Sequence, residues 1–196
     1  MGTETSAVKY NAGLQPGDKG WLCLHRNENL FLDPERETEL IRHVAKRFSM
    51  SSYPDPSCRE LRAAIAELYA VEPENVFIGN GSDEVLSDLF SLLRESYDSV
   101  GTLDVCFKVY SLLARRSGYL QETLPGDTFR SGRVAADDWD GLAVVDSPNS
   151  ITGVQLELEN LLSLKKSDHS FLIWDNAYGE FAGDEPPSTI EKNVVL

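Results

Sequence analysis

A glycine-rich turn at residues 79–84, with the sequence GNGSDE, has the residue types of a phosphate-binding site. It follows an apolar run at 76–78, and Gly79 and Gly81 allow the backbone to turn tightly and to approach a ligand. Ser82 and Asp83 are N-cap residue types, and apolar residues follow them at helical spacing. A helix N-terminus offers unpaired N–H groups and the positive end of the helix dipole. The turn predicts either a phosphate site or an ordinary strand–turn–helix cap.

The same turn excludes two common nucleotide-binding motifs. The third glycine of a dinucleotide-binding turn would fall on Glu84, and no Gly-Lys-Ser/Thr run of a P-loop follows. A phosphate bound here would therefore belong to another class of ligand.

Two apolar runs, residues 142–146 (LAVVD) and 171–175 (FLIWD), each end in an aspartate. A polar loop at 147–153 (SPNSITG) follows the first, and Asp175 closes the second. Ligands of parallel sheets bind at the carboxyl ends of the strands. Because the glycine turn, the loop and Asp175 all follow predicted strands, we expect them to form one site.

The elements that must position these groups alternate between short apolar strands and amphipathic helices. This alternation predicts an α/β fold, a three-layer α/β/α sandwich with a mostly parallel sheet. Further strands are expected at 76–78, 100–106, 119–124 and from 193 onward, and a helix is expected to end at Gly118. Asp33 and Pro34 predict a helix start, with a buried stripe of Leu40, Ile41, Val44 and Phe48. Residues 1–20 are interpreted as an N-terminal arm and residues 21–196 as the domain itself.

The composition is that of a globular protein, with 41% hydrophobic and 26% charged residues among 196. The net charge of −14 argues against nucleic acid and anionic membranes as partners. The three cysteines, Cys23, Cys58 and Cys106, match no zinc or redox spacing, which favours a reduced, cytoplasmic protein and predicts no metal site.

Several segments, in this order along the chain, resemble one family. They are residues 27–29 (NEN), 53–56 (YPDP), 59–62 (RELR), 79–84, 147–153, 175–178 (DNAY) and 180–181 (EF). The chain resembles the large domain of the fold-type I pyridoxal-phosphate-dependent aminotransferases (class I/II), and among these most closely the histidinol-phosphate aminotransferases. The resemblance runs from Trp21 to Leu196.

The resemblance implies pyridoxal 5'-phosphate as cofactor and assigns roles to particular residues. The implied cofactor-binding residues are Gly81, Ser82, Asp83, Phe107, Ser150, Asp175, Tyr178 and, from a partner subunit, Tyr53. Gly81, Ser82 and Asp83 would hold the phosphate. Phe107 would stack on the pyridine ring or, alternatively, is a core residue. Asp175 would keep the ring nitrogen protonated, so that the ring acts as an electron sink, or is a strand-terminal cap.

The remaining implied roles concern the phenolic oxygen of the cofactor, the dimer and the substrate. Tyr178 would donate a hydrogen bond to the phenolic oxygen. Tyr53 would reach the phosphate of the other subunit of a homodimer, and Asn29 would line the substrate entrance. Ser150 stands where the family has the asparagine that binds the phenolic oxygen, and Ile151 replaces the family proline. Val105 and Cys106 stand where the family usually has Pro-Thr ahead of the stacking aromatic residue.

No catalytic residue is expected within the chain itself. The Schiff-base lysine of the family would lie just past Leu196, followed by the small domain, so the large domain is expected to be incomplete at the C-terminus. Lys165 and Lys166 match no family position and are interpreted as surface charges. The chain is therefore expected to be either a fragment of a longer product or a non-catalytic relative.

The function implied by the resemblance is transfer of an amino group between an amino acid, histidinol-phosphate-like or other, and a 2-oxo acid. Three alternatives stay open at this point. One is a truncated homologue acting as a binding or regulatory subunit, and another is a pyridoxal-phosphate decarboxylase of the same fold. The third, a nucleotide- or phosphosugar-binding domain, leaves the pairing of Asp175 with Tyr178 unexplained.

Overall fold

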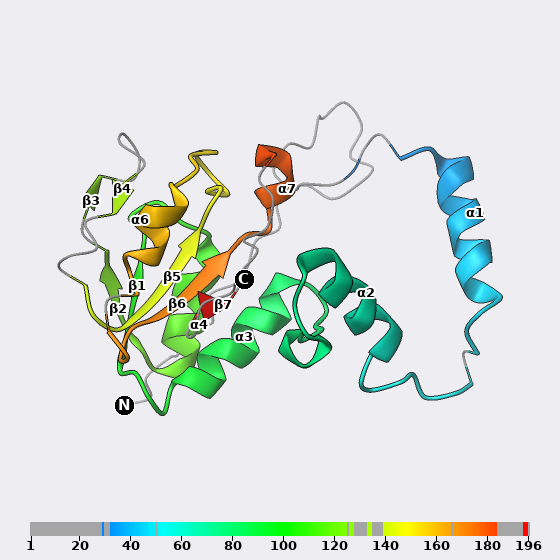
Figure 1. Ribbon diagram of the computed structural model, residues 1–196, viewed down its shortest axis with the longest axis horizontal. Helices are drawn as coiled ribbons and strands as arrows, with labels where there is room; N and C mark the ends of the chain where they lie inside the picture. The colour runs from blue at the N-terminus through cyan, green and yellow to red at the C-terminus, as the bar shows by residue number, and fades with distance from the viewer. Residues whose placement is uncertain are drawn as a thin grey trace, which may run out of the picture. The chain divides into compact units, whose positions relative to one another are not determined.

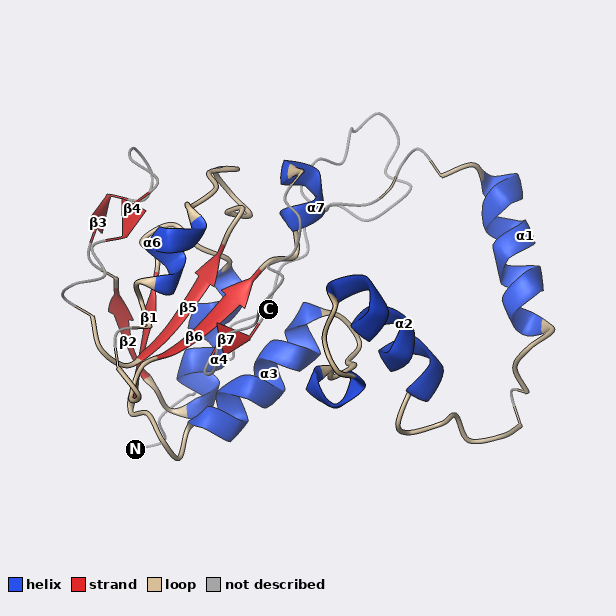
Figure 2. Cartoon of the chain, in the orientation of Figure 1, coloured by secondary structure: helices blue, strands red, loops and turns tan. Residues whose placement is uncertain are grey.

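The structure, a computed structural model, describes residues 29, 32–49, 51–124, 126–127, 133–134, 139–165, 167–183 and 194–195 (Figures 1 and 2). The chain divides into two compact units, residues 1–56 and 57–196. The predicted arm at residues 1–20 lies outside the described residues.

The first unit contains helix α1 (Pro34–Ala45), whose start was predicted from Asp33 and Pro34. Asp33 is the N-cap residue, and its Oδ1 accepts a hydrogen bond from the Glu35 backbone N–H at 3.0 Å. The predicted burial of its apolar stripe is wrong, because the stripe is exposed. The exposed residues are Leu40, Ile41, Val44 and Phe48. The spacing specifies one apolar helix face, but burial needs a facing element, and no second helix or strand occurs among the described residues of this unit.

The second unit contains a five-stranded sheet in which every neighbouring pair is parallel, as predicted. The strand order across the sheet is β2 (Leu120–Thr123), β1 (Ser99–Thr102), β5 (Leu142–Asp146), β6 (Phe171–Asp175) and β7 (Val194–Val195). The predicted bounds of β5 and β6 are confirmed, whereas β1 ends at Thr102, before the predicted residue 106. The carboxyl ends of these strands therefore share one edge.

Helices cover both faces of the sheet, which confirms the three-layer architecture (Figure 1). Successive side chains of a strand point to opposite faces, so β5 and β6 contribute to two separate cores. Helices α3 (Ser82–Leu93) and α4 (Lys108–Ser117) pack against Leu142, Val144 and Ile173. On the other face, α6 (Leu158–Leu162) packs against Ala143, Val145 and Leu172. Burial on both faces explains why these strands read as continuous apolar runs.

The remaining elements are α2 (Arg59–Tyr69), the 3₁₀ helix η1 (Pro73–Asn75), α7 (Gly179–Ala182) and a small antiparallel pair, β3 (Gly126–Asp127) and β4 (Arg133–Val134). The predicted strand at 76–78 is not formed. Phe77 lies exposed. A strand needs a ladder partner, and none of the described strands pairs with these residues.

Candidate functional site

Two carboxylates meet at the carboxyl edge of the sheet, where the two apolar runs end. Asp146 ends β5 and Asp175 ends β6, and the two residues are partners in the strand register. The Ser147 backbone N–H donates to the Asp175 carbonyl oxygen at 3.1 Å, which extends the pairing of the strands by one hydrogen bond. Asp146 is buried, whereas Asp175 is only partly buried, so Asp175 is the carboxylate accessible to a ligand.

The Asp175 side chain accepts hydrogen bonds from two different elements. The hydroxyl of Tyr110, on α4, donates to Asp175 Oδ2 at 2.7 Å, and the Ala177 backbone N–H donates to Oδ1 at 3.2 Å. Tyr110 is fully buried. Burial, followed by the negative charges of Asp175 and Asp146, raises the pKa of Tyr110 far above that of free tyrosine, so its hydroxyl keeps its proton.

Sequence reasoning missed Tyr110. Its only signal was its spacing, since a tyrosine three residues after Phe107 on an apolar helix face brings a hydroxyl into the core and needs a partner there.

Phe107 lies next to this pair, at the N-cap position of α4. Its ring is partly buried and contacts the Tyr110 ring edge to face, with the centroids 5.7 Å apart. The structure thus links Phe107 and Asp175, which are 68 positions apart in the sequence, through the Tyr110 side chain. Phe107 also packs against the core on the α3–α4 face, in line with its interpretation as a core residue, and its stacking role stays a prediction.

The loop at 147–153 is organised around the buried side chain of Asn149. Asn149 Oδ1 accepts hydrogen bonds from the backbone N–H groups of Ile151 and Thr152, at 3.1 and 2.9 Å. Asn149 Nδ2 donates to the Val105 carbonyl oxygen at 2.8 Å and to Asp146 Oδ1 at 3.2 Å. A cavity of about 10 Å³, the volume that about one water needs, lies beneath this loop. The loop is thus held down on the carboxyl edge of β1 and β5.

Ser150 makes its hydrogen bonds with Asp146. Its hydroxyl donates to Asp146 Oδ2 at 2.8 Å, and its backbone N–H donates to the same oxygen at 2.9 Å. Burial raises the pKa of Asp146, the two bonds from Ser150 oppose that shift, and the nearby Asp175 adds to it. A serine hydroxyl has a single hydrogen, and that of Ser150 already forms the hydrogen bond to Asp146. In this conformation the hydroxyl therefore cannot donate to a cofactor oxygen.

The glycine turn leads into α3 one residue earlier than the N-cap types suggested. The helix begins at Ser82 with Gly81 as its N-cap, and no side chain caps it there. Gly81 has φ +81°, and a Cβ placed on it would meet no atom within 4 Å. Glu84 folds back and accepts a hydrogen bond from the Asn80 backbone N–H. The first turn of the helix, with Ser82 and Asp83 exposed, is therefore open to an anion.

The other predicted residues belong to α7, to the segment after α6 and to the first unit. Tyr178 is partly buried at the N-cap position of α7, with its ring 6.4 Å from that of Phe181. Tyr53 and Asn29 belong to the unit of residues 1–56, so their roles stay predictions. Lys165 follows α6, and Lys166 lies outside the described residues.

The described residues contain no group of three or more histidine, cysteine or acidic side chains arranged to hold a metal ion. Among these residues, no helix combines the length and apolar character that a membrane span requires.

The carboxylate and the aromatic ring at this edge, taken together with the first turn of α3, suit a phosphorylated, nitrogen-containing aromatic ring. A partly exposed carboxylate, Asp175, can pair with a protonated ring nitrogen. The half-buried ring of Phe107 offers an apolar face near it, and the open first turn of α3 can accept a phosphate. Ser150 is the residue that fits less well, because its hydroxyl is bound to Asp146.

A parallel sheet covered by helices on both faces, with polar groups gathered at its carboxyl edge, defines a ligand-binding α/β domain. Residues 19–195 match the model of the aminotransferase class I and II family, and the chain belongs to this family. The resemblance inferred from the motifs is thereby confirmed.

Curated relatives and solved structures agree with this assignment. The chain is 32% identical over 191 residues to a histidinol-phosphate aminotransferase of Clostridium botulinum (strain Kyoto / Type A2), covering 93% of this chain and 52% of the relative. It is 35% identical over 193 residues to histidinol-phosphate aminotransferase 2 of Thiobacillus denitrificans, covering 95% and 53%. The fold matches the histidinol-phosphate aminotransferase of Sinorhizobium meliloti, solved with pyridoxal-5'-phosphate, with a TM-score of 0.68 at 24% identity over 80% of this chain and 45% of that one. The chain thus spans about half the length of these relatives.

Proposed function

We propose that this chain is the cofactor-binding part of a pyridoxal-phosphate-dependent aminotransferase that acts on histidinol phosphate or a similar amine. The observation that carries the proposal is Asp175, a carboxylate at the carboxyl end of β6, next to an aromatic pair in a chain of this family. The 32–35% identity to histidinol-phosphate aminotransferases supports the substrate class.

Each residue has a distinct task in this proposal. Asp175 holds a proton on the pyridine nitrogen, and Phe107 packs on the ring face. Gly81, Ser82 and Asp83 receive the phosphate at the N-terminus of α3, where backbone N–H groups and the helix dipole favour an anion. Tyr178 donates to the phenolic oxygen. When bound, the cofactor supplies the electron sink and carries the amine between the two substrates.

Further parts of the proposal concern the assembly and the cellular site. We propose a homodimer in which Tyr53 reaches the phosphate of the other subunit and Asn29 borders the substrate entrance. We propose the cytoplasm as its location, consistent with the acidic composition and with the absence of a disulfide at Cys58 and Cys106 among the described residues.

Binding of a cofactor analogue tests the site. Pyridoxamine 5'-phosphate has no aldehyde, so it cannot react with surface lysines, and its affinity for the 196-residue chain can be measured by equilibrium dialysis. Replacing Asp175 by Asn removes the charge that pairs with the ring nitrogen, and the affinity is expected to fall by about tenfold or more, since a charge-assisted hydrogen bond contributes about 1.5–3 kcal/mol.

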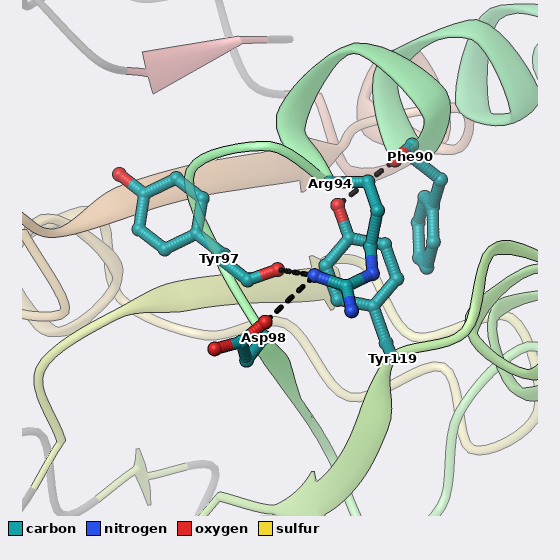
Figure 3. A network of polar contacts seen from close by, with 5 residues as sticks. All are labelled: Phe90, Arg94, Tyr97, Asp98 and Tyr119. Carbon is teal, nitrogen blue, oxygen red and sulfur yellow. Dashed lines mark hydrogen bonds and ion pairs between the residues drawn. The ribbon is translucent and has the colours of Figure 1, made fainter.

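Asp98 provides a matched control, because its exposed carboxylate precedes β1 at the opposite edge of the sheet and pairs with Arg94 at 2.8 Å (Figure 3). Asp98→Asn is expected to leave the affinity unchanged. Equal affinities of Asp175→Asn and the wild-type chain would refute the assigned site.

The reaction is tested on the product of the whole reading frame that contains these residues. With histidinol phosphate and a panel of 2-oxo acids, we expect the 2-oxo acid to be converted to the matching amino acid. The decarboxylase alternative needs a substrate with a carboxylate, so a phosphorylated amino acid is assayed separately. Release of carbon dioxide from it without amine transfer would favour that alternative.

A further inference from the structure

We propose that Tyr110 is a positioning residue for Asp175: its hydroxyl fixes the orientation in which the carboxylate meets the pyridine nitrogen of the cofactor. This inference rests on the proposed function, since it assigns a second residue to the same site.

The geometry holds the Asp175 carboxylate from two sides. The Tyr110 hydroxyl donates to Oδ2 at 2.7 Å, and the Ala177 backbone N–H donates to Oδ1 at 3.2 Å. Each carboxylate oxygen has more than one acceptor site, so one bond to each oxygen leaves capacity for a ring N–H. With a donor from α4 on one oxygen and a donor from its own chain segment on the other, rotation of the carboxylate is restricted before any ligand arrives.

The surroundings of Tyr110 keep its hydroxyl a donor. The charged and titratable groups that act on it are Asp175, Asp146 and the Cys106 thiol, and together with burial they raise the pKa of Tyr110. A tyrosine that cannot lose its proton next to two carboxylates donates its hydrogen bond throughout the neutral pH range. Of these three groups in the described part of the chain, Asp175 is the one that accepts a hydrogen bond from Tyr110.

The Tyr110 ring itself is anchored. It is fully buried in the core of the α3–α4 face and meets the Phe107 ring edge to face. One side chain therefore sets both the aromatic group and the carboxylate of the proposed site. A movement of the Phe107 ring would therefore displace the Tyr110 ring and, with it, the hydroxyl that binds Asp175.

A second buried tyrosine provides a matched control. Tyr119 lies in the same core, contacts Phe90 edge to face with centroids 5.5 Å apart, and donates its hydroxyl to the Phe90 carbonyl oxygen at 2.8 Å (Figure 3). Figure 3 shows it beside Arg94, which lies 5.4 Å from its ring centroid. Tyr119 immediately precedes β2, at the amino edge of the sheet, away from Asp175. Removal of its hydroxyl tests the loss of a buried hydrogen bond without any change at Asp175.

The test compares Tyr110→Phe, Tyr119→Phe and Asp175→Asn in the 196-residue chain, at a temperature where all remain folded. Tyr110→Phe is expected to weaken the binding of pyridoxamine 5'-phosphate by about five- to tenfold, less than Asp175→Asn, because the carboxylate stays but its orientation is no longer restricted. The absorbance band of the bound ring, which depends on the protonation of its nitrogen, is expected to change with Tyr110→Phe. Tyr119→Phe is expected to alter neither affinity nor band.

A double-mutant cycle on stability tests the contact without any cofactor. The effects of Tyr110→Phe and Asp175→Asn on the equilibrium constant for unfolding are expected to be non-additive by about fivefold or more, whereas those of Tyr119→Phe and Asp175→Asn are expected to add.

The two measurements separate the possible failures. If Asp175→Asn loses binding while Tyr110→Phe binds like the wild type, the role of Tyr110 is refuted and the proposed function stands. If the cycle shows coupling but neither variant changes the affinity, the contact exists and the cofactor site is misassigned, which overturns both. Additivity in the Tyr110 cycle contradicts the positioning role directly.

Discussion

Replacement of Asn149 by alanine should destabilise the second compact unit more than any exposed polar substitution. Asn149 makes five side-chain hydrogen bonds: to the Val105 carbonyl oxygen, to Asp146, to the backbone N–H groups of Ile151 and Thr152, and to the Thr152 hydroxyl. They tie the loop at 147–153 to itself and to the segment after β1.

The loss of stability depends on which hydrogen-bond partners of Asn149 can bind water instead once the side chain is removed. Ile151 is exposed, so its N–H can be solvated when the loop relaxes, and the bonds to the loop itself count for little. The bonds to Val105 and Asp146 face a buried side, where an unsatisfied group costs about 1–3 kcal/mol. We expect the free energy of unfolding to fall by about 3 kcal/mol in Asn149→Ala.

Urea denaturation followed by tryptophan fluorescence measures this change. Trp174 reports on the region, because its indole N–H donates to the Ser147 carbonyl oxygen at 2.8 Å. Amide hydrogen exchange at Thr152 should accelerate in the variant even under native conditions.

Asn149→Asp adds a control that depends on pH. The variant keeps an acceptor oxygen for the loop. It also places a second carboxylate next to Asp146, where the wild-type Asn149 Nδ2 donates a hydrogen bond at 3.2 Å. Like charges in a buried place repel, and protonation of one relieves them, so its deficit should be larger at pH 7 than at pH 5. An unfolding midpoint of Asn149→Ala equal to that of the wild type would refute the anchoring role.

Three further predictions concern the sheet and the glycine turn. Burial raises the pKa of Asp146, so folding favours its protonated form. The wild type should therefore gain stability relative to Asp146→Asn as the pH falls from 7, and lose that gain as the pH rises through the folded-state pKa. Urea titrations at several pH values check this direction. Gly101→Ala should cost about 1–3 kcal/mol, measured by thermal unfolding, since its Cβ would overlap the side chains of Leu124 and Trp139. Gly81→Ala meets open space but a φ of +81°, so a smaller cost of about 1 kcal/mol is expected, and an unchanged melting temperature would contradict the strained geometry.

Local patterns predicted most of the sheet. The runs at 142–146 and 171–175 became β5 and β6 with their predicted bounds, because four consecutive apolar residues closed by an aspartate suit strands that are buried on both faces. The strand predicted at 76–78 is not formed, because strand propensity depends on nearby residues whereas a strand also needs a hydrogen-bonding partner from elsewhere in the chain. The stripe of α1 failed likewise, because spacing defines an apolar face but not the surface that covers it.

The candidate site likewise has features that local sequence determines and features that depend on the folded structure. The sequence by itself determined that Asp175 ends a strand, that glycines precede α3 and that the chain belongs among the aminotransferases, because these features depend on residues close together or on motif order. Only the tertiary structure decided that Tyr110 donates to Asp175 across 65 positions of sequence and that Ser150 gives its hydroxyl to Asp146. The physical reason is that hydrogen-bond partners are chosen by distance and direction in the folded core, which the parallel strands and the packing of α4 set together.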